Sequence, residues 1–235
     1  MFFISLIFII LAAIAPGLAW LIFFLREDVH PEPRKFIAYT FGMGGILSVP
    51  IVVIQVLGRG VIFSFFPSVV VMILFLALIE ELFKLLAVYF SVGNTSALSE
   101  PVDFMIYMIV ASLGLATVEN FFILSDFLSS FGVETMKRAG DVMALRFVGA
   151  TFLHALASGI VGFYWAKYRI ESTKKYLFFG IVFATLLHSA FNYLVITFQE
   201  SNFLIYPSIL LIFASVFLFK DFEKLRSASR KDVEV

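Results

Sequence analysis

The chain contains no cysteine among its 235 residues. That absence excludes disulfide bonds, thiolate metal ligands and a cysteine nucleophile. Charged residues are also scarce, at 14% of the sequence, whereas hydrophobic residues make up 61%. Such a composition is far from that of a soluble domain and is typical of a membrane protein. The formal net charge is zero, and we expect no nucleic-acid partner.

No polar stretch between the apolar runs is long enough to form a separate folded domain. The apolar runs themselves are long enough to span a bilayer and recur along the chain. We therefore predict an all-α fold, a polytopic helical bundle with about seven transmembrane helices that forms one integral-membrane domain over residues 1–235. The predicted spans are Phe2–Leu25, Phe36–Leu57, Pro67–Phe90, Val102–Leu124, Ala144–Ala166, Leu177–Phe198 and Phe203–Phe219.

The first span lacks the features of a cleaved signal peptide, because it has no basic start, too long an apolar stretch and no small-residue cleavage site. If the helices alternate in direction, one side of the membrane receives only Arg59, Lys137 and Arg138 between spans. The positive-inside rule then assigns the other, richly basic side to the cytoplasm and the N-terminus to the outside. Residues 220–235 would be a basic cytoplasmic tail, acting either as this topology signal or as a contact with anionic lipid.

Ionisable side chains interrupt four consecutive predicted spans. A charged group at the centre of a bilayer costs about 2.5–3.5 kcal/mol on insertion scales, so such residues are rare and usually functional. Their similar depth predicts that they meet in one reaction centre. They are Glu80, Glu81 and Lys84 in the third span, Glu119 in the fourth, His154 in the fifth and His188 in the sixth.

Glu80, Glu81 and Lys84 form the sharpest motif. Neighbouring helical residues point about 100° apart, so the two carboxylates face different directions. Lys84 lies one turn beyond both and can neutralise one of them. The other carboxylate is then available as a general base or a metal ligand. The spacing leaves open which of Glu80 and Glu81 is the base.

Each predicted-site histidine has a hydrogen-bonding residue one turn later on the same helix face. Asn192 follows His188, and this pair could form a metal ligand with a supporting amide or a pocket for an oxyanion. Ser158 follows His154, with small residues nearby that allow close helix packing. We predict His188, Asn192 and His154 as catalytic residues and Ser158 as a supporting one.

Glu119 and Asn120 lie in the fourth predicted span, and Arg146 lies near the outer end of the next. Two interpretations are open for Glu119. It could form a buried ion pair with Arg146, or it could be a third carboxylate of the site. Asn120 and Arg146 are predicted as supporting residues in either case.

Two histidines and a carboxylate are a common zinc ligand set. The candidate ligands are His154, His188, Glu81 and Glu119, and a single divalent metal, with zinc as the first choice, would acidify a water for attack on a peptide carbonyl. The H-E-x-x-H motif of helical zinc proteases is absent from the sequence.

The same residues also allow a route without metal. Glu80 or Glu81 would act with His154 to activate water, while His188 and Asn192 would stabilise the oxyanion. The sequence does not distinguish this route from the metal-dependent one.

In their order on successive spans, these motifs resemble those of the PrsW-like bacterial intramembrane proteases, within the wider group that includes the CAAX prenyl-protein endopeptidases and bacterial immunity proteases. Asp28 and the Pro31-Glu32-Pro33 segment are also similar to that family. The resemblance implies a multi-pass cell-membrane protease that performs site-1-type cleavage of a single-span membrane protein such as an anti-sigma factor. The motifs are Glu80-Glu81-x-x-Lys84, Glu119-Asn120, His154-x-x-x-Ser158 and His188-x-x-x-Asn192.

The chain departs from the CAAX enzymes, which carry E-E-x-x-x-R and F-x-x-x-H motifs. It has Lys84 at the nearer spacing and Ala150 four residues before His154. These differences favour the PrsW branch and argue against a prenyl-protein substrate.

Two other functional classes use similar residues. Carboxylates and histidines inside a membrane also form ion pathways, so a proton- or cation-coupled transporter is the main alternative. A non-catalytic membrane scaffold is the other. No clear duplication into two halves or pair of broken helices supports a transporter.

Overall fold

The backbone is almost entirely helical. The computed structural model describes residues 2–28, 30–128, 132–198 and 204–233, and these contain helices and no strand. The elements are α1 (Phe2–Leu25), α2 (Arg34–Phe65), α3 (Val69–Val92), α4 (Pro101–Ser125), α5 (Val133–Arg146), the π-helical segment η1 (Phe147–Thr151), α6 (Phe152–Glu171), α7 (Lys175–Phe198) and α8 (Ile205–Val233).

Six helical stretches of the described chain are long and apolar enough to cross a membrane. Helix α3 is 24 residues long and also largely apolar, but it carries Glu80, Glu81 and Lys84 and is not one of the six. The chain is therefore a polytopic helical bundle, as predicted, and a multi-pass membrane protein. Its orientation in the membrane stays a prediction. The six stretches are Phe3–Leu25, Arg34–Phe65, Pro101–Ser125, Val133–Glu171, Lys175–Phe198 and Ile205–Ser227.

Helix α4 lies at the centre of the bundle. Every residue from Val102 to Thr117 is buried, and a helix that is apolar all round needs neighbours on all its faces. Helices α1, α2 and α6 pack against it. Its start is fixed by a capping box between Glu100 and Asp103, with Pro101 at the first helical position.

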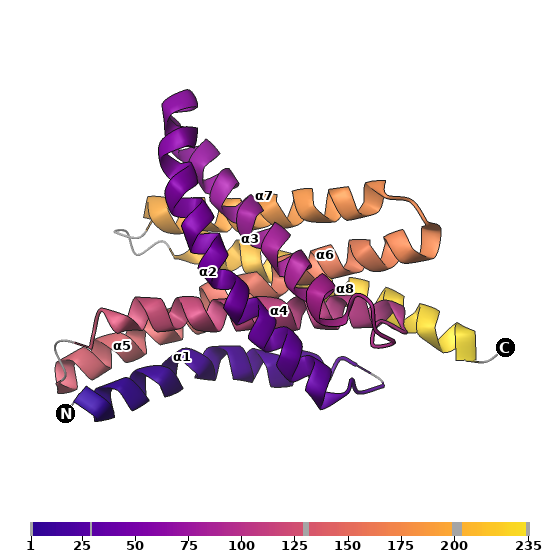
Figure 1. Ribbon diagram of the computed structural model, residues 1–235, viewed down its shortest axis with the longest axis horizontal. Coiled ribbons are helices and arrows are strands. Elements are labelled where there is room, and N and C mark those ends of the chain that lie inside the picture. Colours follow the sequence, from indigo (N-terminus) through magenta and orange to yellow (C-terminus); the bar gives the residue numbers. More distant parts are fainter. Residues whose placement is uncertain (1, 29, 129–131, 199–203, 234–235) are drawn as a thin grey trace.

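Helices α2 and α3 run obliquely across the others, and the end at which they join extends beyond the rest of the bundle (Figure 1). α2 crosses α4 in direct backbone contact. A Cβ atom at Gly44 would lie 1.9 Å from the Ala111 carbonyl oxygen, and one at Gly114 would lie 1.9 Å from that of Phe41. Only glycine permits so close an approach. The crossing divides α2 into two halves that line different cavities.

Several helices are longer than the predicted spans. α2 continues to Phe65 instead of ending near Leu57, because the next proline is Pro67. Helix α5 begins at Val133, within the loop predicted between the fourth and fifth spans. The segment predicted as a tail continues α8 as far as Val233. A 32-residue α2 would be about 48 Å long against a hydrocarbon core of about 30 Å, which fits its oblique course.

The π-helical segment η1 joins α5 to α6. Its widened turn lies between Arg146 and His154 in the sequence, and π-helical turns are frequent at functional sites. The Trp20 indole donates a 2.8 Å hydrogen bond to the Phe147 carbonyl oxygen. Its ring also stacks on Phe147 and Phe152, with centroids 5.2 and 4.3 Å away. Helix α1 thus holds this irregular turn in place.

Candidate active site

A buried ion pair on α3 forms the base of the site. Glu81 and Lys84 are 0% and 1% exposed, and the Lys84 Nζ lies 2.7 Å from Glu81 Oε1. Three positions along a helix bring two side chains onto one face. The sequence left open which glutamate Lys84 neutralises, and in the structure it is Glu81.

His188 on α7 contacts both glutamates. Its Nδ1 lies 2.7 Å from Glu81 Oε1, and its Nε2 lies 3.6 Å from Glu80 Oε2. An ionised carboxylate only accepts hydrogen bonds, so the Nδ1 carries the proton. In the neutral ring, Nε2 then presents a lone pair on the side of Glu80. A carboxylate that orients a histidine in this way is the usual support of a metal-binding imidazole.

His154 on α6 lies between two charged groups. Its Nδ1 lies 2.9 Å from the Lys84 Nζ, and its Nε2 lies 3.1 Å from Glu119 Oε2. An ammonium group only donates, so Nδ1 accepts and Nε2 donates to Glu119. The His154 and His188 ring centroids are 5.1 Å apart and nearly perpendicular. The two predicted histidines therefore converge, as the sequence analysis expected.

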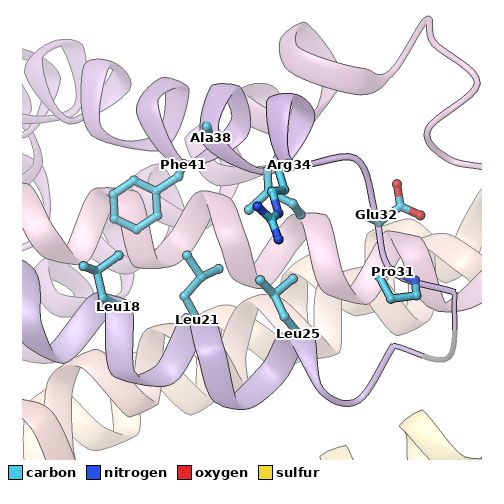
Figure 2. Close-up of a pocket in the computed structure, with 9 residues that line it drawn as sticks. Leu18, Leu21, Leu25, Pro31, Glu32, Arg34, Ala38 and Phe41 are labelled. Atoms are coloured by element: carbon cyan, nitrogen blue, oxygen red, sulfur yellow. The ribbon is translucent and has the colours of Figure 1, made fainter.

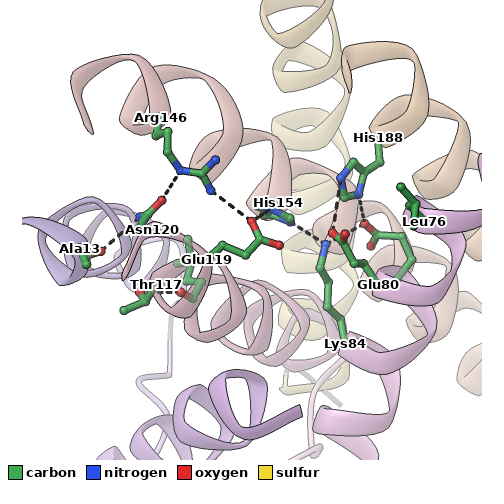
Figure 3. Close-up of polar contacts among 12 residues, drawn as sticks. Ala13, Leu76, Glu80, Lys84, Thr117, Glu119, Asn120, Arg146, His154 and His188 are labelled. Carbon is green, nitrogen blue, oxygen red and sulfur yellow. Dashed lines mark hydrogen bonds and ion pairs between the residues drawn. The ribbon is translucent and has the colours of Figure 1, made fainter. Parts of the chain in front are cut away.

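Glu119 makes both of the contacts that the sequence analysis treated as alternatives. It accepts a 3.1 Å hydrogen bond from Arg146 Nη2 in addition to that from His154. The Arg146 Nε also donates to the Asn120 side-chain oxygen, and the Asn120 amide donates to the Ala13 carbonyl oxygen at 3.2 Å. Figure 3 shows this chain of contacts from α1 to the histidines. Arg146 and Asn120 thus connect the site to α1.

Gln55 on α2 is a site residue that the sequence analysis missed. Its amide donates to Glu80 Oε1 at 2.9 Å and to the Leu76 carbonyl oxygen at 3.2 Å. The available signal was weak: a single neutral amide in an otherwise apolar stretch of the second predicted span. Among the described residues, Gln55 donates a hydrogen bond to Glu80, and no cation lies within hydrogen-bond distance of that carboxylate.

A cavity of about 360 Å³ lies beside these groups, between the second half of α2 and helices α3 and α4. Both Glu80 and Glu119 line it, whereas Glu81 does not. Most of the remaining wall is apolar, which is the usual character of a ligand cavity with a few polar groups. The full lining comprises Ser48, Ile51, Val52, Gln55, Glu80, Leu115, Glu119, Phe122 and Ile123.

Two predicted site residues are not joined to this network. Asn192 is half-buried on α7, and the described hydrogen bonds do not connect it to His188. Ser158 is fully buried, but its hydroxyl has no hydrogen-bond partner among the described residues. Their predicted roles beside the two histidines stay predictions.

One group of metal-binding side chains stands out in the described part of the chain. The donor atoms of Glu80, His154 and His188 lie within 4.8 Å of one another. This set of one carboxylate and two imidazoles suits zinc. It contains both predicted histidines, but its carboxylate is Glu80, whereas the predicted ligands were Glu81 and Glu119. Coordination by His154 would replace its contact with either Lys84 or Glu119.

Comparisons with known proteins point to one family. A family model described as "PrsW family intramembrane metalloprotease" matches residues 32–219. Protease PrsW of Geobacillus kaustophilus (strain HTA426) is 34% identical over 193 residues, which cover 80% of this chain and 80% of that protein. Protease PrsW of Bacillus subtilis (strain 168) is 32% identical over 235 residues, which cover 96% of this chain and 99% of that protein. No solved structure matches the chain.

Proposed function

Because the chain belongs to the PrsW family of intramembrane metalloproteases, we propose that it cleaves a single-span, anti-sigma-factor-like membrane protein at the cavity between α2, α3 and α4. The family favours peptide hydrolysis over coupled transport or a scaffold. The substrate class rests on the resemblance and on the depth of the cavity. Glu80 and Glu119 lie within apolar helices, so a substrate would reach them from within the bilayer.

The observation that carries the proposal is the convergence of Glu80, His154 and His188 within 4.8 Å. These residues would hold one divalent metal, for which zinc is the proposed choice. When bound, the metal would supply a Lewis acid that acidifies water and polarises a peptide carbonyl.

The hydrogen bonds of His188 support this route over the one without metal. Stabilising an oxyanion requires a hydrogen-bond donor. If the His188 Nδ1 donates its proton to Glu81, with which it is in contact at 2.7 Å, a neutral ring has its lone pair at Nε2. A lone pair suits a metal ligand and cannot donate to an oxyanion. Glu81 and Lys84 then act as positioning residues. Glu81 fixes the His188 ring, and Lys84 neutralises the buried Glu81 carboxylate.

Glu80 is the proposed general base. The Glu81 carboxylate bonds to Lys84 and His188, and Glu119 bonds to Arg146 and His154. Glu80 receives one neutral hydrogen bond, from Gln55. A carboxylate has about four lone-pair positions, so Glu80 can face a metal with one oxygen and accept a water proton in the cavity. It would then return this proton to the leaving amine.

The test uses purified protein reconstituted with a tagged single-span substrate. Cleavage is followed on gels, the new terminus is sequenced, and bound metal is measured by elemental analysis. We expect one metal per chain and loss of cleavage in Glu80→Gln, with lower metal content in His188→Asn. Glu134→Gln, at an exposed position of α5, should retain both properties.

Two results would contradict the proposal. Undiminished cleavage by Glu80→Gln would exclude Glu80 as the base. Full activity after complete removal of metal by a chelator would exclude the metal-dependent route and favour the metal-free one.

A further inference from the structure

A second cavity lies on the other side of the crossing between α2 and α4. It has a volume of about 440 Å³, between α1 and the first turns of α2, and shares no lining residue with the active-site cavity. Figure 2 shows Leu18, Leu21 and Leu25 in a row along α1, with Phe41 opposite them on α2. The lining comprises Leu18, Leu21, Leu25, Pro31, Glu32, Arg34, Ile37, Ala38 and Phe41. We refer to these residues as the α1–α2 groove.

Arg34 is the one cation in the lining of this groove. Figure 2 shows its guanidinium directed toward the row of leucines, close to Leu25. No carboxylate of the described residues lies within ion-pair distance of Arg34, whereas Arg146 and Arg226 pair with Glu119 and Glu27. Arg34 therefore has a positive charge available to a ligand in the groove.

The groove changes from polar to apolar along its length. Arg34 begins α2, and Leu25 ends α1, so we expect this end of the groove to lie where the two helices leave the bilayer. From there the lining continues toward Leu18 and Phe41, deeper within both helices. A phospholipid has the same order of chemistry, with a phosphate at the interface and an acyl chain below it.

Glu32 also lines the groove, and its charge would repel an anion. Its carboxylate accepts a 2.5 Å hydrogen bond from the Tyr107 hydroxyl, and Figure 2 shows it pointing away from the leucine row. Burial is the main cause that raises the pKa of Glu32 above its usual value. Glu32 is thus turned toward Tyr107 on α4 and away from the leucine row, which leaves Arg34 as the charged side chain directed into the groove.

We propose that the α1–α2 groove binds one anionic phospholipid, with its phosphate on Arg34 and an acyl chain between Leu18, Leu21 and Phe41. A guanidinium binds two phosphate oxygens through two parallel hydrogen bonds, so arginine favours the phosphate of a lipid headgroup. The apolar lining favours the acyl chain through the burial of both surfaces, so the two ends of the lipid are recognised by different parts of the groove.

Native mass spectrometry of the full-length protein with added phosphatidylglycerol or phosphatidylcholine tests this proposal. We expect one retained phosphatidylglycerol, and binding weaker by about tenfold in Arg34→Gln, the change caused by losing a charge-assisted hydrogen bond. Lys35→Gln is the matched control, because it removes the same charge one residue later. Lys35 is exposed, does not line the groove, and lies over the Phe36 ring.

A second pair of variants tests the acyl-chain half. Leu21→Trp should fill the groove and displace the lipid, while Ile22→Trp, at an exposed position outside the lining, should not. Equal binding of the two lipids by wild type, or equal loss in Arg34→Gln and Lys35→Gln, would overturn the proposal. The comparison of Arg34→Gln with Lys35→Gln tests the proposal even if Leu21→Trp fails to fold.

Discussion

Replacing Lys84 with methionine should destabilise the protein strongly. The Lys84 Nζ is 2.7 Å from Glu81 Oε1, and both side chains are 0% exposed. At this distance the Coulomb attraction is about 6 kcal/mol for an effective dielectric constant of about 20. Desolvation offsets much of that value in the intact pair, but removing only one partner leaves an uncompensated buried charge. We expect Lys84→Met to lower the free energy of unfolding by about 3–5 kcal/mol.

A double-mutant cycle identifies the cause of this loss. Glu81→Gln keeps an oxygen that can accept the His188 hydrogen bond but removes the buried charge. Lys84→Met combined with Glu81→Gln should therefore be more stable than Lys84→Met alone, with a coupling energy of about 2 kcal/mol or more. Unfolding in mixed micelles with increasing denaturing detergent, followed by circular dichroism, measures each value.

Lys137→Met provides the control, because Lys137 is exposed on α5 and its loss should change stability by less than about 0.5 kcal/mol. The reasoning would be refuted if Lys84→Met were as stable as this control. Strictly additive effects of Lys84→Met and Glu81→Gln would also refute it, since additivity would show that the two charges do not interact.

Three further predictions concern other parts of the molecule. Gly44→Ala should cost about 1–3 kcal/mol of stability by overpacking, since its Cβ would lie 1.9 Å from the Ala111 carbonyl oxygen. The control Gly42→Ala meets no atom within 4 Å and should be neutral or stabilising. Equal melting temperatures of the two variants would contradict this prediction. Gln55→Leu should lower kcat by roughly tenfold with metal content unchanged, because it removes the hydrogen bond to Glu80. Val56→Leu, at an exposed site, is the control. An equal kcat in the two variants would exclude a role of Gln55 in positioning Glu80. Burial is the main cause that raises the pKa of Asp28 above 3.8, so the folded state holds this proton more tightly and loses stability as pH rises from about 4 through the raised value. Asp28→Asn should reduce the fall in melting temperature as the pH is raised from about 4, and an unchanged fall would show that Asp28 does not contribute to it.

The convergence of the site could be predicted from the sequence for one physical reason. Ionisable groups inside apolar helices need partners, and the available partners are one another. Lys84, His154 and Glu119 were therefore expected near each other, and they form a continuous chain of contacts. The bundle itself followed from the length and spacing of the apolar runs.

Other features depend on tertiary geometry that periodicity does not contain. The Gln55 amide needs hydrogen-bond partners inside an apolar helix, but its sequence context does not indicate which group supplies them, and its contact with Glu80 arises from the packing of α2 against α3. The π-helical turn after Arg146 has no sequence signal of its own, although it determines how Arg146 and His154 face Glu119. The approach of Gly44 to α4 likewise becomes evident only when both helices are placed.

The different surroundings of Glu80 and Glu81 follow from the rotation of α3. Adjacent helical residues point about 100° apart, so only one of the two carboxylates can form the close ion pair with Lys84. The rotation that places Glu81 between Lys84 and His188 turns Glu80 toward Gln55 and the cavity. One glutamate thereby becomes a buried support for a histidine, and its neighbour keeps lone pairs available for chemistry. Exchanging the two roles would require α3 to rotate by about a quarter turn, which would separate Lys84 from His154 as well.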